Sequence, residues 1–186
     1  MPKKKRRKKP NQFRQEWRDR WPVLRFTSSF LLATILFFVV TNAEWFYQAR
    51  LPLLKLYAEL SSFFLNIFGY ATQTRVDVIS SSSFSVNIKE GCDAVAPSIL
   101  FAVAVLVFPV KWKYRWRGLV VGLLTIFILN IVRIVTLFLT GVHAMSYFEF
   151  MHVEFWQAVF IVLTIMIWLS WLRWATHKEQ SHATAQ

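Results

Sequence analysis

The chain has one cysteine, Cys92, among its 186 residues, so it lacks the paired thiols of disulfides and Cys-X-X-Cys motifs. Disulfide redox chemistry and a structural zinc site are therefore not expected. Charged residues are also scarce, at 17% of the chain, whereas 55% of the residues are hydrophobic, including nine Trp and eighteen Phe. This composition excludes an ordinary soluble domain and indicates a membrane protein.

The sequence does contain apolar runs close to the roughly 20 residues that cross a bilayer as a helix. Four stretches qualify, at residues 26–43, 94–110, 118–140 and 153–171. We therefore predict an all-α integral membrane protein, a polytopic helical bundle with about four spans. The first run ends at Ala43, an acceptable cleavage residue, so a signal peptide is the alternative to an anchor, although the length of the run favours the anchor.

Basic residues cluster beside the apolar runs and predict the topology. Residues 1–20 hold ten Lys and Arg against two acidic residues, the link 111–117 holds four more, and the last run is followed by further basic residues. Because positive charge is typical of cytoplasmic flanks, both termini and the link are expected to be cytoplasmic. Cys92 and residues 141–152 then lie outside. Phosphate binding, to anionic lipid or nucleic acid, is the alternative role of the basic arm, but topology explains it without a specific nucleic-acid partner.

A fifth apolar segment, residues 51–70, cannot be a simple crossing, because both of its ends must lie outside in this topology. Its polar residues form one helical stripe, at spacings of three and four: Pro52, Lys55, Glu59, Ser62 and Asn66. We predict an amphipathic helix at the outer interface or against the bundle, in which Lys55 can pair with Glu59. A re-entrant hairpin is the alternative.

Residues 72–91 contain two short alternating runs, around Val78 and Val86, separated by serines. Such alternation is typical of β-strands, so we expect a small β-hairpin outside the membrane. The predicted organisation is a basic cytoplasmic arm at 1–20, a membrane-embedded domain at 21–175 and a cytoplasmic tail at 176–186.

Arg133 lies deep in the third apolar run, where an arginine costs about 2.5 to 3.5 kcal/mol on insertion scales. Such a residue usually has a function or a partner. It follows Arg117 by sixteen residues, a rise of roughly 24 Å, which places it towards the outer leaflet. Two interpretations stay open: a functional cation that shares a polar face with Asn130, or one that snorkels or pairs with a carboxylate. The candidate carboxylates are Glu90, Asp93, Glu149 and Glu154.

Cys92 precedes the second run and His152 begins the last one. A lone cysteine is often a packing residue, but a helix N-terminus and a nearby cation both favour the thiolate. Histidine is the usual base for a thiol nucleophile, and His143 in the same outer turn is a second candidate. Three runs thus place Cys92, Arg133 and His152 near one membrane face, which predicts a thiol peptidase site. No ligand spacing supports a metal site.

These positions lie in blocks that resemble the signatures of the exosortase and archaeosortase family. The blocks are Glu90-Gly-Cys92-Asp, Asn130-Ile-Val-Arg133-Ile and Met151-His152. The short chain and the stretches 84–92 and 152–157 are most similar to the compact exosortase H subtype. The resemblance covers about residues 51–171, with one departure at Ala94, where the family often has glycine.

The resemblance implies a multi-pass cysteine peptidase or transpeptidase of the bacterial inner membrane, without a cofactor. Its partners would be exported proteins that carry a C-terminal motif, a transmembrane helix and a basic tail, besides the membrane lipids. It would cut this sorting signal at the outer face and transfer the protein to a surface polysaccharide or lipid acceptor. Cys92, Arg133 and His152 are the catalytic positions that it implies. The supporting or substrate-binding candidates are Asn130, Glu90, Asp93, Glu154 and His143.

Two other classes of protein stay open. A channel or transporter subunit, or a non-catalytic scaffold for envelope assembly, would use Asn130 and Arg133 to line a pathway or bind a lipid headgroup. An acyl or glycosyl transferase would need a donor site, and the sequence contains no recognisable one.

Overall fold

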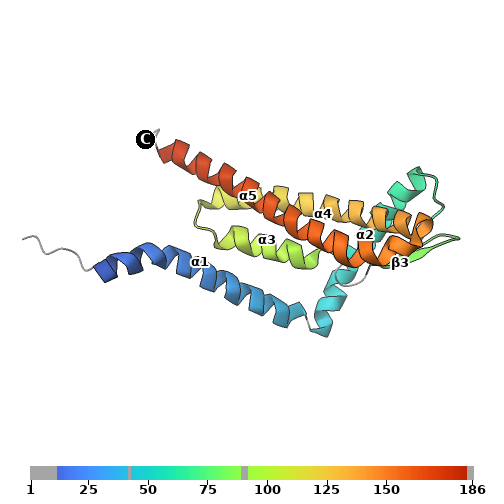
Figure 1. The fold of residues 1–186 in the computed structure, drawn as a ribbon, viewed down its shortest axis with the longest axis horizontal. Helices are drawn as coiled ribbons and strands as arrows, with labels where there is room; N and C mark the ends of the chain where they lie inside the picture. Colours follow the sequence, from blue (N-terminus) through green and yellow to red (C-terminus); the bar gives the residue numbers. More distant parts are fainter. Residues whose placement is uncertain (1–11, 42, 89–91, 184–186) are drawn as a thin grey trace, which may run out of the picture.

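The computed structural model describes residues 12–41, 43–88 and 92–183, most of them helical (Figure 1). The elements are, in chain order, α1 (Gln12–Thr41), α2 (Glu44–Ile67), β1 (Gln73–Arg75), β2 (Val78–Ser80), β3 (Ser85–Asn87), α3 (Val95–Val107), α4 (Trp112–His143), the 3-10 turn η1 (Met145–Tyr147), the π-helical segment η2 (Phe150–Phe155) and α5 (Trp156–Ala183).

Three helical segments among the described residues are long and apolar enough to cross a membrane: Val23–Thr41 in α1, the whole of α4, and Phe150–Ser181. The shorter helix α3 has thirteen residues, about 20 Å, which is less than a hydrocarbon core. It stops because Pro109 disfavours a helical conformation at the preceding residue, and Phe108 is extended. The helical class is confirmed, whereas the prediction of four full-length spans is not.

The long helices lie roughly along one direction, with α3 packed against α1, α4 and α5 (Figure 1). The start of α1, the α3–α4 link and the end of α5 lie towards one end of the bundle, and the sheet lies towards the other. The basic link therefore lies at the same end of the molecule as the start of α1 and the end of α5. A chain that crosses a membrane in alternating directions requires this arrangement.

The helix α2 bends away from the direction of α1 and crosses the bundle obliquely to pack on α4 (Figure 1). It is one continuous helix that begins at Glu44 rather than Leu51, so the segment is not a re-entrant hairpin. Lys55 and Glu59 are exposed and 3.7 Å apart, on the outward face. Ser62 departs from the predicted stripe, because it is buried and its hydroxyl lies 2.7 Å from that of Thr72.

A three-stranded antiparallel sheet with the order β1-β2-β3 occupies the region in which a two-stranded hairpin was predicted. The strands β2 and β3 are the two predicted runs, paired with Ile79 opposite Val86. The additional strand β1 contains no apolar residue, so the alternation pattern could not reveal it. The ring of Phe84 sits on Gly141, where a Cβ atom would collide with it, and this contact joins the sheet to the end of α4.

The opposite end of α4 is held by aromatic packing on two glycines. A Cβ at Gly118 would collide with the indole of Trp171 in α5, and one at Gly122 with the ring of Phe101 in α3. The Trp171 indole nitrogen donates to the Tyr114 carbonyl at 3.0 Å. Gly118 and Gly122, two small residues four positions apart, therefore let α3 and α5 pack closely against α4 within the chain.

Candidate active site

Cys92 lies between β3 and α3, three residues before the helix begins. The residue is buried, with 5% of its surface exposed. Its Sγ lies 2.9 Å from Nε2 of His152, and the tautomer of the ring decides which atom donates the hydrogen. The predicted nucleophile and one of its two candidate bases are thus in hydrogen-bond contact, as base-assisted nucleophilic chemistry requires.

The imidazole of His152 is presented by the π-helical segment η2, directly before α5. A π-helical turn changes the angular position of side chains relative to an α-helix, and such turns occur frequently at functional sites. The ring of Phe148 stacks on the imidazole at 5.7 Å between centroids, with 25° between the planes. Backbone geometry and stacking together aim His152 at the sulfur.

Arg133 completes the group from α4, with 5% of its surface exposed. One terminal nitrogen of its guanidinium lies 3.5 Å from Cys92 Sγ and 3.5 Å from the His152 carbonyl oxygen, to which it donates. The guanidinium also lies over the ring of Phe160, 5.3 Å from its centroid. The three residues predicted to meet do so, from three separate elements of the chain.

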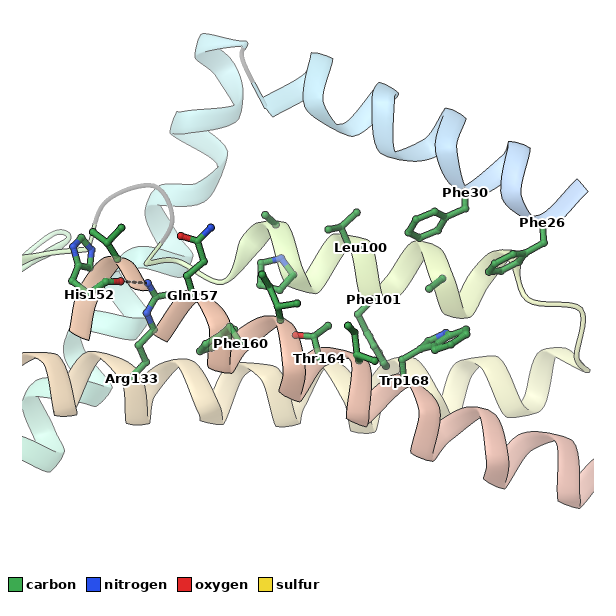
Figure 2. A pocket seen from close by; sticks show the side chains of 16 residues that line it. Phe26, Phe30, Leu100, Phe101, Arg133, His152, Gln157, Phe160, Thr164 and Trp168 are labelled. Atoms are coloured by element: carbon green, nitrogen blue, oxygen red, sulfur yellow. Dashed lines mark hydrogen bonds between the residues drawn. The ribbon is translucent and has the colours of Figure 1, made fainter. Parts of the chain in front are cut away.

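A groove of about 780 Å³ leads away from these residues along α3 and α5 (Figure 2). Arg133, His152 and Gln157 line one end of it, and Phe26, Phe30 and Trp168 the other. The lining between them is apolar except for Thr164. Arg133 and His152, the two residues in contact with the thiol, therefore lie at the end of an apolar groove between helices.

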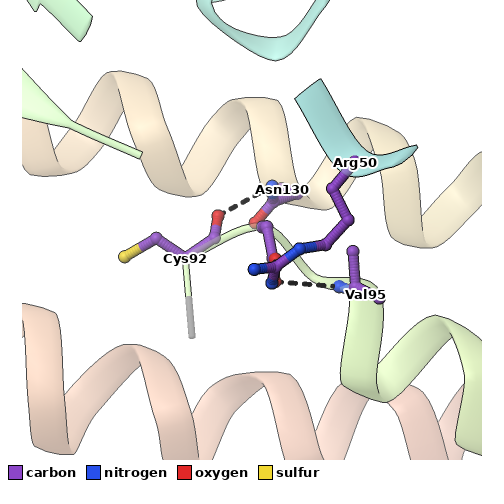
Figure 3. A network of polar contacts seen from close by, with 5 residues as sticks. Arg50, Cys92, Val95 and Asn130 are labelled. Atoms are coloured by element: carbon purple, nitrogen blue, oxygen red, sulfur yellow. Dashed lines mark hydrogen bonds and ion pairs between the residues drawn. The ribbon is translucent and has the colours of Figure 1, made fainter. Parts of the chain in front are cut away.

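Asn130 fixes the backbone of the nucleophile (Figure 3). It is fully buried one helical turn before Arg133, and its amide nitrogen donates to the Cys92 carbonyl oxygen at 3.0 Å. The helix α4 thus contacts the Cys92 residue twice, through the amide of Asn130 and the guanidinium of Arg133. The sequence predicted that Asn130 supports the site, and the structure gives it this contact.

Asp93 pairs with a residue that the sequence did not single out. Its carboxylate lies 2.8 Å from the guanidinium of Arg50 in α2, and both side chains are buried. The other carboxylate oxygen accepts the Val95 amide at 3.2 Å and so satisfies the first amide of α3 (Figure 3). The structural interpretation in which Asp93 pairs with Arg133 is therefore wrong.

The remaining predicted positions do not join this group. The ring of His143 hydrogen-bonds the hydroxyl of Tyr70 and not the thiol. Of the two histidines that the sequence left as candidate bases, the structure therefore favours His152. Glu154 is exposed on η2, and Glu90 lies outside the described residues. Among the described residues, no three His, Cys, Asp or Glu side chains are grouped to hold a metal ion.

The electrostatics of the loop favour a protonated thiol at rest. Burial raises the pKa of Cys92, the Arg133 cation lowers it, and the Asp93 carboxylate raises it. Because the thiol is the stable form, the thiolate must form by transfer of a proton to a neighbouring base. His152 is in contact with the sulfur and can accept that proton.

Sequence reasoning missed Arg50, which the fold brings to the site from 42 residues upstream. A basic residue before an apolar helix is common at a membrane interface, so nothing local marked it. The only available signal was that Asp93, an acid beside a predicted nucleophile, needed a counter-charge.

Comparison with known proteins gives one family. A family model described as transmembrane exosortase (Exosortase_EpsH) matches residues 21–170, which include every described residue of the site. The match confirms the resemblance predicted from the three sequence blocks. Neither curated proteins nor solved structures give a match.

Proposed function

This chain belongs to the transmembrane exosortase family, and on that premise we propose that it is a membrane-embedded cysteine peptidase or transpeptidase. Its substrates are exported proteins with a C-terminal sorting signal, composed of a motif, a transmembrane helix and a basic tail. The observation that carries the proposal is the contact of one thiol with both an imidazole, at 2.9 Å, and a guanidinium, at 3.5 Å.

The first step forms a thioester. His152 Nε2 takes the proton of Cys92, and the sulfur attacks the carbonyl carbon of the scissile peptide. Negative charge develops on the carbonyl oxygen, and the buried Arg133 stabilises it by a charge-assisted hydrogen bond. The carbon–nitrogen bond then breaks, and His152 returns its proton to the leaving amine.

The second step releases the protein. An acceptor, either water or an amine, loses a proton to His152 as it attacks the thioester carbonyl. Arg133 again stabilises the oxyanion, the carbon–sulfur bond breaks, and the proton returns to the Cys92 thiolate. The enzyme is then restored, and the acceptor is bonded to the new C-terminus of the exported protein.

The groove of Figure 2 supports a substrate that enters from the membrane. From His152 to Trp168 the groove follows sixteen residues of η2 and α5, roughly 24 Å of rise, which is most of a hydrocarbon core. We assign its apolar wall to the transmembrane helix of the sorting signal, because a helix seated there would hold the preceding peptide bond near Cys92. Packing between helices, rather than burial from water, would provide the affinity.

The sidedness of the site belongs to the same proposal. The basic α3–α4 link, the start of α1 and the end of α5 share one end of the molecule, and β3, which precedes the loop of Cys92, lies towards the other. By the positive-inside rule, the basic end is cytoplasmic and the thiol faces the outside of a bacterial inner membrane. An exported protein would thus be cut only after it has crossed.

The test is co-expression with a candidate substrate that ends in a motif, a helix and a basic tail. The wild-type chain should produce a shorter protein whose new C-terminus is found by mass measurement. Cys92→Ala and Cys92→Ser should leave full-length substrate in the membrane, whereas Ser83→Ala, an exposed control in the β2–β3 loop, should process normally. Processing by Cys92→Ala would refute the assignment of the nucleophile.

A further inference from the structure

The ion pair between Arg50 and Asp93 is buried, and burying two charges costs free energy. The guanidinium nitrogen and the carboxylate oxygen are 2.8 Å apart, with 9% and 5% of the two side chains exposed. Removing two charges from water costs several kcal/mol each, so a buried pair is weak support for stability alone. A function at this position would account for its presence.

The carboxylate is fixed beside the nucleophile by the start of α3. Asp93 accepts the Val95 amide, and Ala94 between them has φ +51° and ψ 17°, a left-handed conformation. Asp93 precedes the N-cap residue Ala94 and accepts the amide of Val95, the first helical residue, so it satisfies one of the amides that a helix start leaves unpaired. This contact, however, places a buried negative charge on the residue that follows Cys92.

That negative charge opposes the chemistry of the thiol. The pKa of Cys92 is raised first by burial and also by Asp93, while Arg133 lowers it. Among the described residues, the charged or titratable groups around the thiol are Arg133 from α4, His152 from η2, and the Asp93–Arg50 pair, of which Arg50 comes from α2. Tyr57 of α2 also faces Asp93, and burial raises its pKa so that it stays neutral. The sequence of α3 has no titratable residue.

We propose that Arg50 is a positioning residue that neutralises Asp93, so that the carboxylate can satisfy the first amide of α3 without opposing formation of the Cys92 thiolate. The rings of Phe46 and Tyr47 lie 5.4 and 5.6 Å from the guanidinium carbon and hold it in place. The helix α2 thus takes part in the site as the source of a counter-charge. The proposal rests on Cys92 as the reactive thiol of the proposed function, but testing it requires no substrate.

The same helix supplies a matched control. Lys55 and Glu59 also form an ion pair, at 3.7 Å, but their side chains are 63% and 53% exposed. Such surface pairs contribute little, because water already stabilises both charges. If burial beside the thiol is what matters, then loss of the Arg50 charge has a consequence that loss of the Lys55 charge does not.

The experiment measures the rate at which a small alkylating reagent, iodoacetamide, modifies the intact protein in detergent micelles as a function of pH. Cys92 is the only cysteine of the chain, so the signal needs no background mutations. In Arg50→Gln the midpoint of the pH profile should move up by about one unit, with an alkylation rate near pH 7 about tenfold below wild type. Arg50→Lys should stay within about threefold of wild type, and Lys55→Gln should be unchanged.

The double variant separates neutralisation from structural support. Asp93→Asn alone should move the midpoint down, because it leaves the Arg50 cation near the thiol. Arg50→Gln with Asp93→Asn should return the midpoint to within about half a unit of wild type, since no uncompensated charge remains. A role limited to packing would change the rate equally at all pH values and would leave the midpoint in place.

Two results would overturn the proposal: a wild-type midpoint in Arg50→Gln, or a double variant displaced as far as Arg50→Gln itself. Size-exclusion chromatography and tryptophan fluorescence identify variants that have lost the fold. If Arg50→Gln does not fold, Asp93→Asn decides alone, and a midpoint that stays or moves up refutes the role of Arg50. None of these outcomes depends on peptide cleavage, so the proposed function can fail independently.

Discussion

The two ends of α4 belong to one helix but follow different physical rules. In its C-terminal half, which we call the polar end, the buried side chains of Asn130 and Arg133 hydrogen-bond to Cys92. In its N-terminal half, which we call the packing end, aromatic rings pack directly on the backbone of Gly118 and Gly122. Burying polar groups is costly unless they find partners, whereas close packing between helices is favourable. Changes at the first end should therefore alter chemistry, and changes at the second should alter stability.

The largest effect is expected from the base at the polar end. His152→Gln removes the group that moves protons, and processing should slow about 10²- to 10⁴-fold, the usual contribution of general acid–base catalysis. The matched change is His143→Gln, which removes the hydrogen bond and the ring contact with Tyr70 and should leave the processing rate near wild type. Quantifying processed substrate in both variants is the measurement. Equal loss in both would mean that the thiol contact does not identify the base.

Arg133→Lys tests the guanidinium at the same end. Lysine keeps the charge but lacks the planar fork that donates to sulfur, carbonyl and oxyanion together. Loss of an oxyanion donor typically costs about 10²- to 10³-fold in rate, and we expect processing to fall by that amount. Arg117→Lys, in the exposed basic turn of the same helix, is the control and should be silent. Near-normal processing in Arg133→Lys would favour the interpretation of Arg133 as a structural cation.

The packing end is tested by Gly122→Leu. The added side chain meets the buried ring of Phe101, so unfolding in detergent should become easier by about 1–3 kcal/mol, the usual cost of overpacking. Val121→Leu enlarges the neighbouring position, which is 65% exposed, and should leave stability unchanged. The folded fraction of Gly122→Leu should alkylate Cys92 at the wild-type rate. A changed alkylation midpoint would show that the two ends are coupled.

The sequence predicted the helical class because length and apolarity are local properties. The candidate spans Trp112–His143 and Phe150–Ser181 each contain one predicted run, and Val23–Thr41 covers the first run up to its last two residues. It overestimated α3, where apolar residues continue to Val110 but Pro109 ends the helix early. It also missed β1, because Gln73–Arg75 has no apolar alternation and pairs only through its backbone.

The site could be predicted from the sequence only for those residues whose type is unusual in their surroundings. Cys92 and Arg133 are rare residue types in apolar surroundings, so the sequence alone marks each of them. The choice between His143 and His152 could not be made from spacing, since both lie in one outer turn and the π-helical segment decides which ring reaches the sulfur. Arg50 could not be predicted for a related reason. Its contact with Asp93 depends on the fold, which brings α2 to the loop that holds Cys92.

The smallest predicted effect concerns the junction between the polar loop and α3. Ala94 is buried at φ +51°, a conformation that costs a non-glycine residue about 1–2 kcal/mol. Ala94→Gly relieves this cost but loses a buried methyl group and adds chain entropy, about 0.8 and 0.4–1 kcal/mol, so the stability should barely change. Ala58→Gly, equally buried but inside α2, has no such relief and should destabilise by about 1–2 kcal/mol. Unfolding of both variants in detergent measures the difference, and equal losses would mean that Ala94 is not held in a left-handed conformation.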